Sequence, residues 1–173
     1  RQTDIVTYYG GNSDPSKGTV SPGIGANIVI PMTGAYSYYT DWVTEPNTSE
    51  IKGPQKWETF LTRELPQAIE PALKANDKRA IAGMSMTGTT SLLYAQHHPG
   101  FYDSVGSFSG CAATTTGLTP KFIDLVLNRG GTDFTKMWGQ VNGEVARNND
   151  ALINAEKLRG QKNIYVSTSS GFP

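Results

Sequence analysis

Short runs of apolar, mostly β-branched residues alternate along the chain with longer stretches in which apolar residues recur every three or four positions. The short runs predict four strands, at residues 27–31, 79–84, 104–109 and 163–167. The run at 27–31 is closed by a proline and has the composition of a buried parallel strand. Strands that alternate with helices indicate an α/β architecture with a mostly parallel sheet.

The longer stretches predict helices between these strands. We expect them at residues 55–65, 66–75, 88–98, 119–129 and 149–158. Prolines define several of the ends, because Pro66 interrupts the first helical pattern and Pro99 cannot continue the third.

The helix that begins at Thr119 and Pro120 is the clearest of these, since threonine caps helix N-termini and proline fits the first helical turn. Its apolar side chains form one stripe, which either packs into the core or covers an acyl-binding groove. The stripe consists of Phe122, Ile123, Val126 and Leu127.

The run from Ala80 to Tyr94 has the pattern of a buried strand, a glycine-flanked serine and the first turns of a helix. A sharp strand-to-helix turn of this kind, a nucleophile elbow, holds a serine hydroxyl out above a sheet. The pattern predicts Ser85 as the nucleophile. It also predicts that the backbone N–H of Met86 stabilises the oxyanion.

A serine hydroxyl needs a general base, and the two histidines of the chain are poorly placed for that role. His97 and His98 follow Ser85 by about three helical turns, roughly 18 Å at 1.5 Å per residue. We therefore expect partly packed residues at a helix C-terminus that do not reach Ser85. Being adjacent, they should lie on different faces of the helix. With the carboxylates scattered, no metal site and no bound cofactor are predicted.

Composition and charge narrow the remaining possibilities. Fifteen Lys and Arg residues balance fifteen Asp and Glu residues without a basic cluster, so nucleic acid is not an expected partner. Asp41 and Asp103 are expected to make surface or turn hydrogen bonds. The single cysteine, Cys111, is expected to be a small buried residue at a strand end. The length fits one domain over residues 1–173.

Several motifs, in this order along the chain, resemble the antigen-85-type mycolyltransferases. They are Ile30–Trp42, Lys56–Pro66, Gly83–Gly88 with Tyr94–Pro99, Met137–Gly139 and Arg147–Asp150. The likeness covers nearly the whole chain, and only the loop at 10–25 matches poorly.

The resemblance implies an α/β-hydrolase fold and a secreted enzyme of the cell envelope. Such enzymes move a mycolyl chain from trehalose monomycolate, through an acyl-serine, to a second trehalose monomycolate or to cell-wall arabinogalactan. The implied site residues are Ser85, the Met86 backbone and, as a weak match, Gln2 at a sugar-binding position. Trehalose monomycolate, cell-wall glycolipid acceptors and peripheral contact with the outer lipid layer are the implied partners.

The family's early strand and its catalytic Glu and His have no counterpart within residues 1–173. The chain is therefore expected to form only a portion of the full α/β-hydrolase domain. Two alternatives remain open. One is a related secreted serine esterase or acyl-hydrolase, in which water accepts the acyl group, and the other is a non-catalytic carbohydrate- or lipid-binding domain that lacks the triad base.

Overall fold

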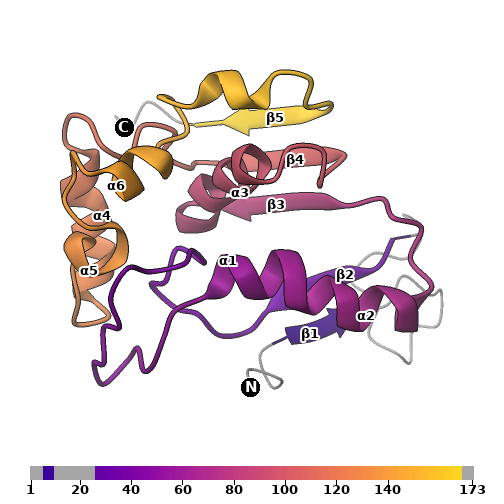
Figure 1. Ribbon diagram of the computed structural model, residues 1–173, viewed down its shortest axis with the longest axis horizontal. Coiled ribbons are helices and arrows are strands. Elements are labelled where there is room, and N and C mark those ends of the chain that lie inside the picture. The colour runs from indigo at the N-terminus through magenta and orange to yellow at the C-terminus, as the bar shows by residue number, and fades with distance from the viewer. Residues whose placement is uncertain (1–5, 10–25, 169–173) are drawn as a thin grey trace.

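The computed structural model describes residues 6–9 and 26–168, which form two separate sheets flanked by helices (Figure 1). Strands β1 (Val6–Tyr9) and β2 (Ile28–Pro31) pair antiparallel. Strands β3 (Ala80–Met84), β4 (Ser104–Phe108) and β5 (Ile164–Ser167) form a parallel sheet in that order. Gln2, the expected sugar contact, lies outside the described residues.

The parallel sheet arises because helix α3 (Met86–His97) carries the chain from the end of β3 back to the start of β4. Helix α3 packs on β3 and β4 (Figure 1). On the face beneath this helix, Val105 and Ser107 of β4 are buried, whereas Met84 and Phe108 on the other face are exposed. The helix ends at His97 before Pro99, as the sequence predicts.

The hydrophobic core lies between α3 and the helices and loops that surround it. Leu93 and Tyr94 of α3 are almost fully buried there, together with Trp138. The core cluster also contains Tyr38, Trp42, Ile51, Leu92, Ala95, Tyr102, Val105, Ile123, Leu127, Phe134, Met137, Ala146 and Ala151. Burial of these side chains is the main force that holds α3 in place.

The prediction of a buried parallel strand at 27–31 is wrong in two respects. Strand β2 pairs antiparallel with β1, a segment whose sequence predicted no strand, and Ile30 is 40% exposed. A β-branched run favours an extended backbone, but the choice of partner strand depends on long-range pairing that the run does not encode.

The helical segment continues through Pro66, where the sequence predicted that it would be interrupted. Helix α1 (Trp57–Thr59) passes into a π-helical turn, η2 (Phe60–Glu64), and then into α2 (Leu65–Leu73). Pro66 lies in the first turn of α2, immediately after the π-helical turn. A proline is tolerated in a first turn, where its missing N–H costs little.

The helix predicted at 149–158 is also wrong, since turns and a short 3₁₀ helix, η3 (Ala155–Leu158), occupy this region. The Asp150 carboxylate accepts the backbone N–H groups of Leu152 and Ile153, at 3.1 and 3.0 Å. A side chain that caps the backbone locally in this way competes with regular helix formation.

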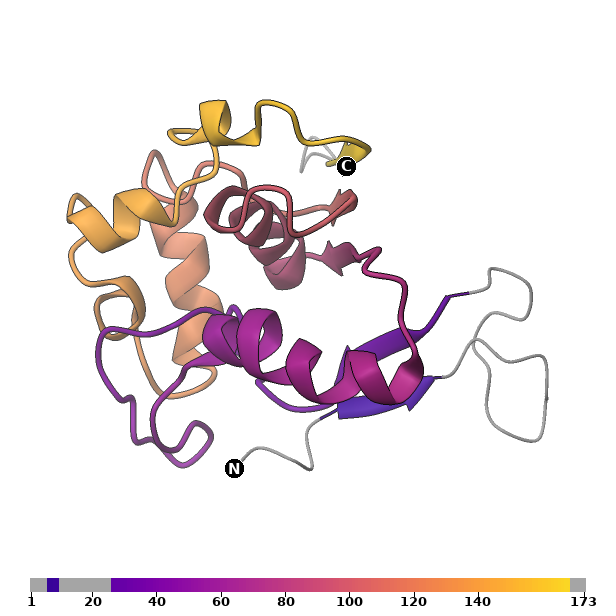
Figure 2. The same ribbon diagram turned by 45° about the vertical axis from the view of Figure 1, so that its right-hand side comes forward.

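The remaining helices form the side of the molecule seen at the left of Figure 1, and Figure 2 shows them from another angle. They are α4 (Thr119–Asn128), α5 (Phe134–Trp138) and α6 (Glu144–Asn148). Only part of the apolar stripe of α4 packs into the core: Ile123 and Leu127 are buried there, while Phe122 is 55% exposed. No described helix is long and apolar enough to cross a membrane.

Candidate active site

Ser85 stands at the junction of β3 and α3, with a backbone conformation that non-glycine residues rarely adopt. Its φ is 55° and its ψ is −118°. A serine held at positive φ costs on the order of 1–3 kcal/mol, which the surrounding structure must offset. The sharp turn that the sequence predicts is therefore present at Ser85, and the strain makes the turn itself a candidate functional feature.

Glycines on both sides make this turn possible, because there is no room for a larger side chain. A Cβ on Gly83 would lie 2.1 Å from the backbone oxygen of Thr87. A Cβ on Gly88 would lie 2.8 Å from the backbone oxygen of Phe108. The strand, the turn and the helix consequently approach one another more closely than alanine would allow.

Hydrogen bonds fix the turn to the sheet and to the helix. The backbone N–H of Ser85 donates to the Phe108 oxygen of β4 at 2.8 Å, and the Ser85 oxygen accepts from Thr89 at 3.2 Å. The Thr87 hydroxyl accepts from the Met84 N–H and donates to the Met84 oxygen, both at 2.9 Å. The position of the Ser85 backbone is thus determined by contacts on both sides.

The Ser85 hydroxyl and the Met86 N–H, the two groups that the sequence predicts to react, lie at this turn. Ser85 is exposed, and within residues 6–9 and 26–168 its hydroxyl has no hydrogen-bond partner. The backbone N–H of Met86, at the first position of α3, also has no acceptor among the described residues. A free N–H at a helix N-terminus beside an exposed serine suits an oxyanion donor.

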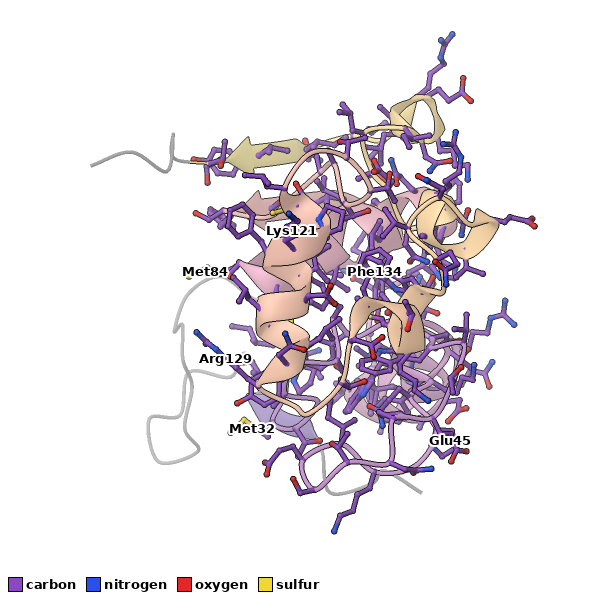
Figure 3. All side chains as sticks on the ribbon, turned by 90° about the vertical axis from the view of Figure 1, so that its left-hand side faces the viewer. Met32, Glu45, Met84, Lys121, Arg129 and Phe134 are labelled. Carbon is purple, nitrogen blue, oxygen red and sulfur yellow. The ribbon has the colours of Figure 1, made fainter. Side chains whose placement is uncertain are left out.

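Exposed apolar side chains occur close to Ser85 in the sequence and on α4. Met84, which directly precedes the serine, is 70% exposed; Leu118, immediately before α4, and Phe122 and Leu125 on α4 are 55–61% exposed. Figure 3 looks onto α4, with Lys121 towards one end of the helix, Arg129 at the other and Met84 beyond its edge.

The loop between β2 and α1 is fastened directly to α3. Tyr38 and Tyr39 of this loop adopt positive φ, at 52° and 50°. The Tyr38 oxygen accepts from the Thr90 hydroxyl at 2.5 Å, and the Tyr39 oxygen accepts from the Tyr94 hydroxyl. The strained loop is therefore held against the helix that carries the serine at its N-terminus.

His97 and His98 do not reach Ser85, as predicted, but the expectation that they face different ways is wrong. Both rings contact the same oxygen, Oε1 of Glu58: His97 Nδ1 at 2.8 Å and His98 Nε2 at 2.9 Å. The reason is that His98 has left the helix, with φ −127° and ψ 67°, so its ring can turn towards Glu58.

The pKa values of this group reflect its burial and its hydrogen bonds. Burial alone would raise the pKa of Glu58, but hydrogen bonds from both histidines outweigh it and lower that pKa to about 2. Burial alone would lower the pKa of His97, but the hydrogen bond and charge of Glu58 outweigh it and raise that pKa above its ordinary value. The two groups thus favour each other's charged forms.

The predictions for Asp41 and Asp103 are confirmed, whereas the prediction for Cys111 is wrong. Asp41 accepts the Thr59 N–H at 3.2 Å and the Thr59 hydroxyl at 2.5 Å, which ties the loop to α1. Asp103 is exposed and contacts Lys78 and the backbone of Arg79. The prediction for Cys111 is wrong, since it lies beyond the end of β4 and is exposed. Among the described residues, no cluster of His, Cys, Asp and Glu could hold a metal ion.

Sequence reasoning missed two groups that the fold brings together. One is Glu58 with the two histidines, which lie 39 and 40 residues away from it. The other is the fully buried Asp150, which accepts from the backbone of Thr114 and Thr115. The sequence gives no signal for either group, because Glu58 and Asp150 both have polar neighbours and their partners are distant in the chain.

A parallel sheet with a strained, glycine-flanked serine between strand and helix is the central part of an α/β-hydrolase fold. Comparison with known proteins confirms this fold. The crystal structure of Mycobacterium tuberculosis MPT51 (FbpC1) matches with a TM-score of 0.73 and 28% sequence identity, over 84% of this chain and 53% of that chain.

Residues 22–172 match the family model described as putative esterase, and the chain belongs to that family. It is 32% identical over 153 residues to the diacylglycerol acyltransferase/mycolyltransferase Ag85B of Mycobacterium leprae. It is 30% identical over 154 residues to Ag85C of the same organism. Each alignment covers 86% of this chain and 46% of the relative, so the chain spans about half the length of these relatives. The predicted resemblance to antigen-85-type mycolyltransferases is thereby confirmed.

Proposed function

We propose that the protein containing this chain is a serine acyltransferase. It would move a mycolyl group from trehalose monomycolate to a second trehalose monomycolate or to cell-wall arabinogalactan. The observation that carries this proposal is the strained backbone of Ser85, at φ 55° and ψ −118°, which leaves the hydroxyl exposed and unpartnered among the described residues. Strain retained at an exposed serine is expected where the hydroxyl reacts.

In the proposed reaction, the Ser85 oxygen attacks the ester carbonyl of the donor while a base takes the hydroxyl proton. The Met86 N–H stabilises the oxyanion, and loss of one such donor typically costs about 2.7–4 kcal/mol in the transition state. The bond between the carbonyl carbon and the trehalose oxygen then breaks, and trehalose leaves with the proton. A hydroxyl of the acceptor sugar attacks the acyl-serine in the same way and regenerates Ser85.

The proposal requires a base and an orienting acid from outside residues 1–173. The two histidines of the chain are bound to Glu58 and lie about three helical turns from Ser85. The residues 1–173 are accordingly proposed to form part of one α/β-hydrolase-type domain. Gln2 is proposed, on the resemblance alone, as a sugar contact.

Secretion to the cell envelope and peripheral contact with the outer lipid layer belong to the same proposal. Their support is the similarity to proteins named as mycolyltransferases and the exposed apolar side chains at Met84 and on α4. A donor with a long acyl chain has to leave a lipid phase, and exposed apolar surface suits that step.

A related esterase or acyl-hydrolase is the second candidate, and the family description as putative esterase favours it. It shares the acyl-serine and differs only in the acceptor, which is water. A non-catalytic carbohydrate- or lipid-binding domain is the third candidate, and what supports it is that His97 and His98 contact Glu58 and not Ser85 in the described part of the chain.

The test uses the full-length protein with trehalose monomycolate as the acyl donor and a phosphonate label for reactive serines. Ser85→Ala should abolish both labelling and acyl transfer, whereas Ser49→Ala, a control at a remote exposed loop, should leave both unchanged. Trehalose dimycolate as the main product supports the transferase, and free mycolic acid as the main product supports the esterase. Full activity in Ser85→Ala, or no labelling of the wild type, would refute the serine mechanism.

A further inference from the structure

A second group of titratable residues lies at the end of α3 far from Ser85. It consists of Glu58 on α1 with His97 and His98 at the C-terminus of α3, and we call it the Glu58 cluster. The side chains of Glu58, His97 and His98 are 15%, 11% and 22% exposed. Such partly buried charges interact more strongly than charges in open solvent. The proposed acyl transfer does not use this cluster.

The two ring nitrogens of His97 both face oxygen atoms. Nδ1 lies 2.8 Å from Glu58 Oε1, and Nε2 lies 3.0 Å from the backbone oxygen of Asn148, the last residue of α6. A neutral imidazole has one N–H donor and could serve only one of these acceptors. An imidazolium has two donors and serves both, so this geometry is that of the charged form.

The neutral form would have a different partner nearby. The side-chain Nδ2 of Asn148 lies 3.3 Å from His97 Nε2 and could donate to it once that nitrogen has lost its proton. The oxygen of the same Asn148 amide accepts from Lys157 at 3.2 Å, which holds the amide in this orientation. Loss of the proton would therefore exchange a charged hydrogen bond to the backbone for a longer, neutral one to a side chain.

The charges around His97 favour the cation on balance. Among the described residues, Glu58 is the one carboxylate in direct contact with His97, and His98 shares its Oε1 atom. Lys157 opposes a positive charge on His97, but from beyond Asn148. The phenols of Tyr94 and Tyr102, which also face Glu58, stay protonated because burial raises their pKa values further above neutral pH. The contact with Glu58 is the strongest of these interactions.

The helical segment that begins with α1 has an irregular turn close to Glu58. The π-helical turn η2 begins two residues after Glu58, and the Thr62 hydroxyl donates to the Glu58 backbone oxygen at 2.7 Å. A π-helical turn leaves carbonyl groups without their regular helical partners, and these turns often occur at functional sites. The irregular helix is consequently well suited to a local change in conformation.

We propose that His97 is a pH-sensitive clamp, an imidazolium that joins α1 and α6 to the end of α3 and holds them more weakly when it loses its proton. The clamp does not rest on the proposed acyl transfer. The change would be local, because the core residues of α3 remain packed whatever the charge of His97.

The pH range follows from the direction of the shifts. The pKa of His97 is raised in the folded protein. The contribution of His97 to the free energy of unfolding is therefore complete below the pKa of an unfolded histidine, about 6.5, and is lost as the pH rises through the pKa of His97 in the folded protein. Because the pKa of Glu58 is lowered to about 2, its contribution is lost as the pH falls from about 4.3 towards 2. The clamp should therefore be fully closed between about pH 4.3 and 6.5.

The first experiment is an NMR titration of the full-length protein with ¹⁵N-labelled histidine, in which His97→Gln identifies the signals of His97. The expected result is a His97 titration midpoint above that of the same histidine in urea, with protons on both ring nitrogens at pH 6. A midpoint equal to or below the unfolded one, or a single protonated nitrogen at pH 6, would overturn the proposal.

The second experiment measures the melting temperature of the wild type and His97→Gln between pH 5.5 and 8.5. The melting temperature of the wild type should exceed that of His97→Gln by less as the pH rises, because the wild type loses the charge of His97 while both proteins retain the contact between His98 and Glu58. His98→Gln is the matched control, since it removes the other Glu58 partner but leaves both oxygen acceptors of His97 in place, so the His97 midpoint should stay above the unfolded one. A pH-independent advantage of the wild type over His97→Gln would show that His97 only fills space.

Discussion

Replacement of Asp150 by asparagine is a sharp test of how the loop after β4 is held. The Asp150 side chain is fully buried, and its two carboxylate oxygens accept five hydrogen bonds. Oδ2 accepts from Thr114 N at 3.0 Å, from Thr115 N at 2.8 Å and from Thr115 Oγ1 at 2.6 Å. Oδ1 accepts from the backbone N–H groups of Leu152 and Ile153.

Asparagine has nearly the same shape but only one acceptor oxygen. Whichever way its amide is turned, two backbone N–H groups face an NH₂ group instead of an oxygen. A buried donor left without an acceptor costs about 1–3 kcal/mol, so Asp150→Asn should lower the free energy of unfolding by about 2–6 kcal/mol. That is a large share of the roughly 5–15 kcal/mol that stabilises an ordinary domain.

The pH dependence provides an independent check. Burial alone would raise the pKa of Asp150, but the hydrogen bonds from Thr115 and the neighbouring backbone groups outweigh it and lower the pKa. Because its pKa is lowered in the folded protein, the Asp150 carboxylate makes its full contribution to the free energy of unfolding above the pKa of an unfolded aspartate, about 3.9. This contribution is lost as the pH falls below that value. The difference in the free energy of unfolding between the wild type and Asp150→Asn should thus be largest near neutral pH and should decrease towards pH 3.

The assay is urea unfolding at pH 7, pH 5 and pH 3, with the free energy of unfolding extrapolated to water. Asp103→Asn is the control, because it makes the same chemical change at an exposed carboxylate and should have a much smaller effect. A loss below about 1 kcal/mol at pH 7 would refute the reasoning on unpaired donors. A difference that stays constant down to pH 3 would show that the carboxylate charge is unimportant.

Two further predictions concern the elbow and the core. Gly83→Ala places a Cβ 2.1 Å from the Thr87 oxygen. This variant should therefore lower the free energy of unfolding, measured in urea, by more than about 3 kcal/mol. Gly106→Ala, whose Cβ would lie 3.0 Å from the edge of the Phe108 ring and 3.3 Å from the Ala82 Cβ, should cost far less, and equal losses would contradict the close packing of the elbow. Leu93→Ala, at a fully buried position, should cost about 2–5 kcal/mol in the same assay. Leu125→Ala, at a 61% exposed position, should change stability by less than about 0.5 kcal/mol, and a comparable loss would contradict the assigned core.

The sequence predicted those elements whose formation depends on neighbouring residues. The segment from β3 through α3 to β4 was recognised because its strands are apolar runs, its turn is rich in glycine and Pro99 follows its helix. Helix α4 was recognised from its first turn and its apolar stripe. The turn at Ser85 belongs to the same group, since the small residues that permit it lie within five positions of the serine.

The tertiary structure decided everything that depends on a partner distant in sequence. The pairing of β2 with β1 instead of a parallel strand is one case, and the meeting of Glu58 with His97 and His98 is another. The turns after Asp150 are a third, because the same carboxylate also holds a loop 35 residues away. The periodicity of apolar residues encodes which face of an element is buried, but it does not encode which polar group will be found there. Long-range packing and strand pairing made those choices.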